Sequence, residues 1–424
     1  MKVISALMAV VSIAMALLYL TFKGPSFIQT TPETTEPDAA FTAAVGRIRE
    51  FAATLEVQEV DIDPRAVTLD QKTLEFTLID HSITARKVRS EQVLNPDGTQ
   101  SIVWYGNLEP HASVVPEIAQ WQDPLNFITL VKSGQTVTGT IRQGGQLYQL
   151  RPVGSHRHVV IVLDGTKMPP ETDNVELPKR TLNPAPAHSA SNRSAAPVTL
   201  DVMTVVPQQT VTDYQGDMLA LMQLAVALAN QSYINSNIDM TLRLVSYQVT
   251  DYVPNAAFPG LDLIRLRTPN DGFMDDSLSV RDQVRADVVI YIYRSAPAGD
   301  DSQSCGQALQ YGSTADTAFA MVNHECIANF TFGHEIGHLQ FARHEFDSDP
   351  SLTPYPFAHG YRFTAGGHTW HTVMGTQPNP PTSQRLNIWS NPDIRYEGAP
   401  LGDAESADNH RVLETTKEAI SGYR

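Results

Sequence analysis

The chain has 424 residues, of which 42% are hydrophobic and 18% are charged, and its formal net charge is -16 at pH 7. This length exceeds what one hydrophobic core usually organises, so we expect two domains with connecting segments. The composition is that of a globular protein and excludes a low-complexity chain. The negative charge argues against nucleic acid or an anionic membrane surface as a partner, because either would repel it.

The N-terminus is predicted to be an export signal. Residues 3–22 form a largely apolar run between Lys2 and Lys23, and Ala14-Met15-Ala16 offers a small-x-small cleavage site. A run of about 20 residues is also long enough to span a bilayer uncleaved. We therefore expect residues 1–23 to be a signal peptide or a membrane anchor, in a protein that is secreted or periplasmic.

The chain contains only two cysteines, Cys305 and Cys326. In an exported protein such a pair usually forms a disulfide. Closing a loop of this length would contribute on the order of 3 kcal/mol by the chain-entropy estimate. The alternative is two free, buried thiols.

Residues 24–164 are predicted to form a small, mainly antiparallel β domain. A Pro- and Thr-rich spacer is followed by a short helix around residues 41–55. Alternating apolar and polar residues then indicate strands, with Asn95-Pro96-Asp97-Gly98 and Gly144-Gly145 as turns between extended runs. The strand candidates are residues 74–78, 127–131, 137–141 and 158–163.

Residues 165–197 change character and are predicted to be a linker. Prolines, serines and alanines dominate the segment, and such a composition cannot build a core. It contains the dibasic pair Lys179-Arg180, a candidate maturation site in an exposed setting where proteolysis is favoured.

Residues 198–424 are predicted to form a second domain of α/β type. A helix over residues 216–230 lies between strand candidates 200–206 and 240–245, and residues 288–293 form a continuous apolar run. Such a run is typical of a strand that is covered on both faces. Strands that alternate with helices indicate a sheet with crossover connections.

Residues 334–338 read His-Glu-Ile-Gly-His and predict a metal site. Two histidines four residues apart lie on the same face of a helix, so both imidazoles can reach one cation. Zinc suits nitrogen ligands in this geometry. Glu335 projects beside such a metal, where it can take a proton from the attacking water and deliver it to the leaving amine.

The downstream residues sharpen this pattern. His344 lies six residues beyond His338, and Met374 lies in Thr372-Val373-Met374-Gly375-Thr376. Together these residues resemble the metzincin clan of zinc peptidases, with its three-histidine motif and its Met-turn. The resemblance implies that His334, His338 and His344 bind one catalytic Zn²⁺, that Glu335 is the general base, and that Met374 forms the floor of the site.

The resemblance also implies a fold: a mixed five-stranded sheet with an active-site helix, and a smaller, mostly irregular lower part, with the cleft between them. Thr376 stands where astacin-like and serralysin-like relatives place a tyrosine ligand, so the chain looks closer to the reprolysin type. Residues 305–309 correspond to the edge strand that pairs with extended substrate in the family, a mode that demands little of the substrate sequence. The alternative is a disulfide-tethered loop.

Ser390-Asn391-Pro392 and residues 402–424 resemble the bacterial reprolysin-like branch that contains the peptidyl-Asp metalloendopeptidases. The resemblance implies an exported, monomeric zinc endopeptidase that acts on protein or peptide substrates. A preference for acidic side chains beside the scissile bond would call for a basic residue in the pocket. Arg385 and Arg395 are the candidates.

One departure from the family motif concerns the third ligand. Phe341 stands where the family has the glycine that turns the chain after the second histidine. A bulky residue at positive φ costs on the order of 1 kcal/mol or more. Either Phe341 is strained or the helix ends by a different turn, and if His344 then misses the metal, Glu345 or Asp347 become candidate ligands.

A β domain, a linker with a dibasic pair and a protease domain follow one another in the order of a zymogen. We therefore interpret the region before the maturation site as a propeptide that covers the cleft. It contains no cysteine, which excludes a thiolate latency switch, so His156, His158 or an acidic side chain would have to cap the metal. The rival hypothesis is a membrane-tethered binding module with an inactive protease-like domain; Phe341 favours it and an intact Glu335 argues against it.

Overall fold

The computed structural model describes residues 26–30, 39–110, 116–154, 157–171, 197–255, 259–294, 304–378 and 381–424. The predicted signal or anchor at residues 1–23 and the pair Lys179-Arg180 lie outside these ranges. Within the described ranges, no helix combines the length and the apolar character needed to cross a membrane.

The N-terminal part is a nine-stranded antiparallel sheet, as far as the chain is described, with the order β1-β2-β9-β8-β7-β6-β5-β4-β3. Short turns join its central strands, and Gly144 and Gly145 both adopt the positive φ that the turn between β7 and β8 requires. The strands are β1 (Ile28–Thr30), β2 (Thr54–Ile62), β3 (Thr73–Leu78), β4 (His81–Leu94), β5 (Gln100–Leu108), β6 (Phe127–Ser133), β7 (Thr136–Gln143), β8 (Gln146–Val153) and β9 (Arg157–Leu163). Helix α2 (Ala39–Arg49) packs beside β2.

The C-terminal part contains a second sheet with the order β11-β10-β12-β14-β13. Its strands are β10 (Val198–Pro207), β11 (Met240–Thr250), β12 (Val288–Tyr293), β13 (Gly306–Ala308) and β14 (Phe319–Asn323). The first four strands in that order pair in parallel, and β13 pairs antiparallel with β14 at one edge. Every residue of β12 is buried, as its apolar run predicts. The chain is thus a mixed α/β protein, which confirms the predicted class.

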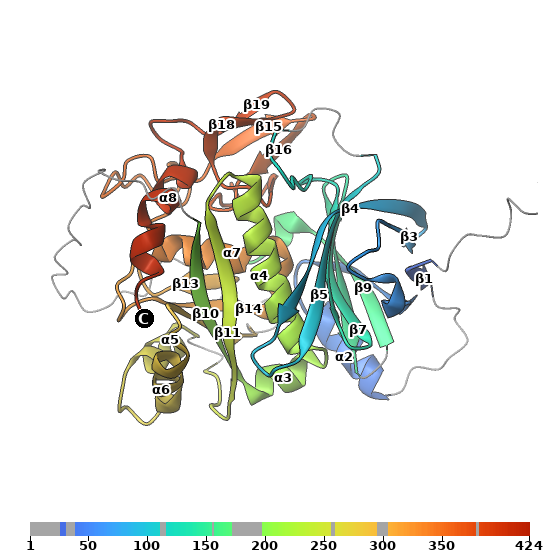
Figure 1. The fold of residues 1–424 in the computed structure, drawn as a ribbon, viewed down its shortest axis with the longest axis horizontal. Helices are drawn as coiled ribbons and strands as arrows, with labels where there is room; N and C mark the ends of the chain where they lie inside the picture. The colour runs from blue at the N-terminus through green and yellow to red at the C-terminus, as the bar shows by residue number, and fades with distance from the viewer. Residues whose placement is uncertain are drawn as a thin grey trace, which may run out of the picture.

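Helix α4 (Met218–Asn235) lies between the two sheets (Figure 1). Fifteen of its 18 residues are buried, so it has no solvent-exposed face. On one side it packs in a cluster with residues of β10 and β11, and on the other with Val103, Tyr105, Phe127 and Val131 of the N-terminal sheet. The N-terminal sheet and the C-terminal part therefore share one apolar layer.

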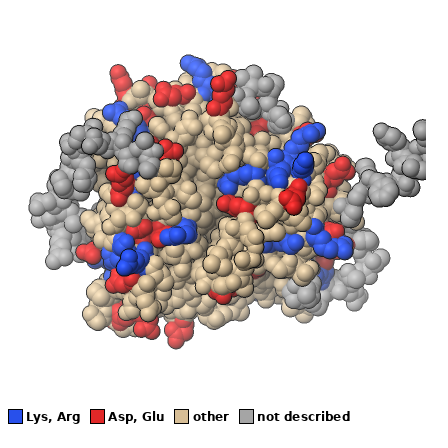
Figure 2. Space-filling view, in the orientation of Figure 1, with Lys and Arg blue, Asp and Glu red and all other residues tan. Residues whose placement is uncertain are grey.

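The remaining helices and short strands surround the second sheet, and α8 lies near its β10 strand (Figure 1). The helices are α3 (Gln208–Tyr214), α5 (Pro259–Arg267), α6 (Asp275–Val284), α7 (Thr331–Leu339) and α8 (Asn409–Ile420). The strands are β15 (Arg362–Ala365), β16 (His368–His371), β17 (Ser383–Arg385), β18 (Asn391–Tyr396) and β19 (Ala399–Leu401). On the face drawn in Figure 2, acidic and basic side chains are interspersed.

Candidate active site

Helix α7 carries the His-Glu-Ile-Gly-His sequence, and all nine of its residues are buried. Gly337 allows this burial, because a Cβ atom there would lie 2.6 Å from the ring of Trp389 and 3.1 Å from the Sδ atom of Met374. Only a residue without a side chain lets the helix approach both neighbours so closely. The helix is thereby fixed against the core, with its histidines on one face.

Three imidazoles meet at the end of α7. The Nε2 atom of His344 lies 3.2 Å from Nε2 of His334 and 3.2 Å from Nε2 of His338. One ring nitrogen from each of the three lies within 4.8 Å of the other two, and all three side chains are buried. Ligands about 2.0–2.1 Å from a tetrahedral zinc ion would be about 3.3 Å apart, which is close to these separations.

In two of these histidines, the other ring nitrogen, Nδ1, forms a hydrogen bond with a backbone carbonyl oxygen. His334 Nδ1 donates to the carbonyl oxygen of Val373 at 2.8 Å, and His338 Nδ1 donates to that of Ala342 at 2.8 Å. In the neutral rings, both Nε2 atoms therefore point lone pairs at His344. Burial lowers the pKa of His334 and His338 well below the ordinary value, which keeps the rings neutral. Converging lone pairs need a cation between them, so these residues fit zinc.

Phe341 does adopt positive φ, +68°, and so turns the chain toward the third histidine. The helix ends in a Schellman motif, in which the Ala342 N–H donates to the Gly337 carbonyl at 2.9 Å and the Phe341 N–H to the His338 carbonyl at 3.1 Å. Packing stabilises the strained residue, because its ring lies edge-on to Tyr355 with 5.6 Å between centroids.

The carboxylates of Glu345 and Asp347, the alternative third ligands, do not join the two histidines of α7. Glu345 accepts hydrogen bonds from the backbone N–H of Thr376 at 2.7 Å and from the Thr376 hydroxyl at 2.8 Å, and it pairs with Arg362. The side chain of Asp347 is 87% exposed. Phe341 therefore does not turn His344 away from the other two histidines, and Thr376 has a structural partner.

Met374 lies directly under α7 and is fully buried. Its backbone approaches Gly360 so closely that a Cβ atom on that glycine would lie 2.6 Å from the Met374 carbonyl carbon. The preceding residue, Val373, supplies the carbonyl that orients His334. The turn at Val373 and Met374 therefore supports the site both by packing and through one hydrogen bond to a histidine.

Glu335 is completely buried, and neither carboxylate oxygen has a hydrogen-bond partner among the described residues. Burial, and then the charge of Glu171, raise its pKa well above the ordinary value. The side chain lies against Gly306 of β13, where an added Cβ atom would come within 2.4 Å of Oε1. A buried carboxylate that has no side-chain partner among the described residues, beside three histidines, is typical of a general base.

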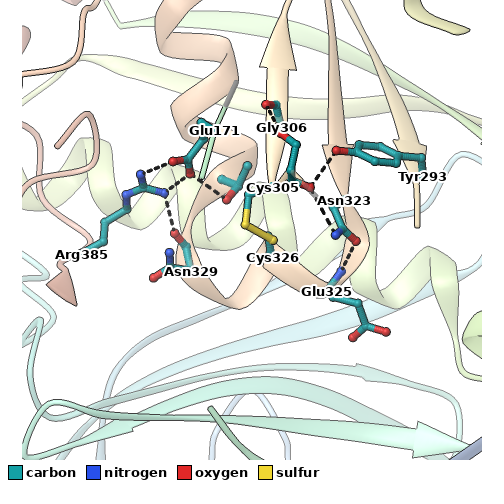
Figure 3. Close-up of a disulfide and its surroundings, with 11 residues drawn as sticks. Glu171, Tyr293, Cys305, Gly306, Asn323, Glu325, Cys326, Asn329 and Arg385 are labelled. Atoms are coloured by element: carbon teal, nitrogen blue, oxygen red, sulfur yellow. Dashed lines mark hydrogen bonds and ion pairs between the residues drawn. A yellow bond between two sulfur atoms is a disulfide. The ribbon is translucent and has the colours of Figure 1, made fainter. Parts of the chain in front are cut away.

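The predicted disulfide between Cys305 and Cys326 is formed, and it links the start of β13 to the short helix His324–Asn329 that precedes α7 (Figure 3). The disulfide thus connects the edge strand of the sheet to the segment that leads into α7.

One residue near the site was not predicted from the sequence. Glu171 forms a buried ion pair with Arg385 (Figure 3), although residues 165–171 were assigned to the linker. Met168-Pro169-Pro170-Glu171 did carry a signal, because consecutive prolines favour the extended backbone of a strand-bound peptide.

Two of the other candidates, the basic residue Arg395 and the capping residue His158, are not at the site. Arg395 is exposed and donates to the carbonyl of Gly398 at 3.0 Å. His158 accepts from the backbone N–H of Val137 at 3.2 Å within the N-terminal sheet. His156 lies outside the described residues.

Comparisons with known proteins agree with this geometry. Residues 219–345 match the reprolysin-like metallopeptidase family M12B. A peptidyl-Asp metalloendopeptidase from Xanthomonas campestris pv. campestris is 41% identical over 408 residues, which cover 95% of this chain and 94% of the relative. A peptidyl-Asp metalloendopeptidase from Stenotrophomonas maltophilia strain R551-3 is 42% identical over 90% of this chain and 89% of its own. One from Pseudomonas fragi is 32% identical over 46% of this chain and 99% of its own.

A mixed α/β fold with a buried three-histidine site and these matches define a zinc metalloendopeptidase, a hydrolase of peptide bonds. More specifically, the chain belongs to the peptidyl-Asp metalloendopeptidase family of reprolysin-like metallopeptidases.

Proposed function

We propose that His334, His338 and His344 hold the catalytic zinc ion through their Nε2 atoms, with Met374 as the floor of the site. The convergence of the three rings on one point is the observation that carries this proposal. When bound, zinc would lower the pKa of a water molecule and polarise the scissile carbonyl.

Glu335 is the general base in this proposal. Its carboxylate is fully buried on the residue that follows His334, and its raised pKa suits a group that must both accept and release a proton. It takes a proton from the attacking water and delivers it to the nitrogen of the leaving amine. No covalent nucleophile takes part.

The substrate is an extended peptide that pairs with the edge of the sheet at β13. This strand is last in the order of its sheet, and Gly306 brings it into contact with Glu335. The relatives named above are peptidyl-Asp metalloendopeptidases, and we propose that this chain also cuts beside aspartate. It acts as a monomer on protein or peptide substrates and not on nucleic acid.

The full-length chain is a zymogen in this account, with a prodomain at residues 24–164, a linker at 165–197 and the peptidase at 198–424. The packing of the N-terminal sheet against α4, and of Glu171 against Arg385, supports a role in covering the site. Maturation would follow cleavage near Lys179-Arg180.

Export is proposed from residues 1–23, as a cleaved signal or an anchor. A formed disulfide supports an oxidising compartment, secreted or periplasmic.

The experiment that tests the proposed function is mass-spectrometric mapping of cut sites in a peptide library, with and without a chelator. We expect chelator-sensitive cuts beside aspartate that return when zinc is added. Cuts that persist without metal would contradict the proposed site, and cuts spread evenly over all residues would contradict the aspartate preference.

A further inference from the structure

Glu171 and Arg385 form a buried pair although 214 residues separate them in the chain. The guanidinium of Arg385 binds the carboxylate of Glu171 through two hydrogen bonds: Nη1 donates to Oε1, and Nη2 donates to Oε2 at 2.9 Å. The side chain of Arg385 is 2% exposed and that of Glu171 is 6% exposed, and the hydroxyl of Thr331 at the start of α7 lies 3.4 Å from Oε1 of Glu171. This is the geometry in which arginine recognises a carboxylate.

Arg385 is held in place by more than Glu171. Its Nη2 donates to the carbonyl of Gly375 in the Met-turn at 3.0 Å, and its Nη1 lies 3.4 Å from the carbonyl of Asn329 just before α7. Its own carbonyl accepts from Arg142 Nη1 at 2.6 Å. Without Glu171, the guanidinium would stay in the site as a buried cation. Such a charge is costly without an anion, so the site favours another carboxylate in its place.

The pair lies beside the reacting groups. The carbonyl of Pro170 accepts from the N–H of Cys305 at 2.9 Å, which places the residue before Glu171 against the start of the edge strand. The next residue, Gly306, touches Glu335. A side chain in this position is therefore next to the scissile bond of a bound peptide.

We propose that Arg385 selects substrates with an acidic side chain beside the scissile bond, and that Glu171 occupies the place of that side chain in the full-length chain. The proposal rests on the proposed peptidase function and names the residue behind its aspartate preference. Glu171 thus acts as an internal pseudosubstrate, and its departure exposes a receptor built for a peptide carboxylate.

Selectivity is tested with two peptides that differ only in aspartate or asparagine, since the amide keeps the shape and removes the charge. Full-length protein is cut by limited proteolysis at the linker, and kcat/KM is then measured at nanomolar concentration, so that the N-terminal fragment that carries Glu171 dissociates. We expect the wild type to favour aspartate by about 100-fold or more, because a site built for a polar partner rejects the analogue that lacks it. Arg385→Gln should bring the two values within about 3-fold. Arg395→Gln, an exposed arginine, is the matched control and should keep the preference.

Arg385→Lys is a second variant, to be used if the glutamine variant does not fold. Lysine keeps the positive charge but cannot bind a carboxylate through two nitrogens at once. We expect an aspartate preference between those of wild type and Arg385→Gln. An active Arg385 variant with the full preference would overturn this inference alone. Absence of cleavage by every form, wild type included, would overturn the proposed function and this inference with it.

The pseudosubstrate role is tested on unprocessed chains. Glu171→Gln should raise hydrolysis of the aspartate peptide by about 10-fold or more through a lower apparent KM, because the substrate then competes with an uncharged side chain. Glu75→Gln, on an exposed position of β3, should leave the rate of the unprocessed chain unchanged. Equal rates for Glu171→Gln and wild type, with processed forms active, would overturn the role of Glu171.

Discussion

The ring of Phe341 occupies the space where a side chain on Gly312 would be: a Cβ atom there would lie 2.0 Å from Cε1 of Phe341. Both residues have φ of +68°. Phe341 ends α7 and turns the chain toward His344, so the contact with Gly312 bears on the geometry of the metal site. Phe341 thus adopts a conformation that favours glycine, and the absence of a side chain on Gly312 leaves room for its ring.

Gly312→Ala is therefore expected to destabilise the protein and loosen the metal site. Overpacking costs about 1–3 kcal/mol, in addition to about 1 kcal/mol for a Cβ at positive φ. Thermal unfolding and zinc retention measure both effects. Gly154→Ala is the matched control, because φ is +67° and nothing lies within 4 Å of its Cβ position. Equal losses of stability and of bound zinc in the two variants would show that the contact between Gly312 and Phe341 does not contribute to either property.

The third ligand is tested by His344→Ala, which should weaken zinc binding by about 100-fold or more, since a three-ligand site loses one of its nitrogens. Zinc per chain is measured after dialysis against a graded series of chelator concentrations. Asp347→Ala is the control, because this exposed aspartate is the alternative ligand. Zinc loss in the Asp347 variant, with retention in the His344 variant, would reverse the assignment.

Stability should fall as the pH drops from about 6.5 to about 4. Burial lowers the pKa of His324 to about 4, with Arg151 and Arg294 acting in the same direction and Glu325 against them. An unfolded histidine titrates near 6.5, so in this window the unfolded chain binds the additional proton and stability is lost, on the order of a few kcal/mol at most. Urea midpoints at pH 7.5 and 4.5 measure the change.

His324→Phe removes the titrating group and keeps an aromatic ring against Tyr214, whose centroid is 5.3 Å from that of His324. We expect a smaller drop between the two pH values than in the wild type. His81→Gln, at a side chain that is 70% exposed, should behave as the wild type does. An identical drop in the His324 variant would assign the acid sensitivity to other groups.

A chain cut in the linker should stay in one piece under native conditions. Helix α4 is buried by both sheets, Gln122 and Asn235 exchange hydrogen bonds of 3.1 and 3.0 Å, and Arg151 pairs with Glu325 at 3.2 Å in a buried position. Separation would expose apolar surface and an unpaired buried charge. Size-exclusion chromatography after limited proteolysis at micromolar concentration checks this, and elution of two separate fragments without denaturant would contradict it.

Much of the local structure follows from sequence patterns. The four-residue spacing of His334 and His338 places them on one helix face by geometry alone, and the apolar run at residues 288–293 indicates a buried strand. Boundaries were less accurate: helix α2 ends at Arg49, and Thr54 and Leu55 already belong to β2, where the sequence analysis expected helix. Strand pairing with β9 overrides the local helical pattern there.

Long-range contacts were not predictable from the sequence. The αL conformation of Phe341 depends on the space above Gly312, 29 positions earlier in the chain, and no local rule favours phenylalanine there. The pairing of Glu171 with Arg385 has no periodic signature, and a single sequence could only name Arg385 as a candidate. The burial of α4 on both faces was equally hidden, because the sequence of a helix does not reveal what covers each of its faces.

Glu335→Gln tests the central claim most directly, because it removes the base and preserves the size of the side chain. Zinc content and casein hydrolysis are measured on the same processed preparation. We predict about one zinc per chain, as in the wild type, with hydrolysis lower by about 100- to 10,000-fold. Casein cleavage at the wild-type rate, with zinc still bound, would contradict the assignment of Glu335 as the general base.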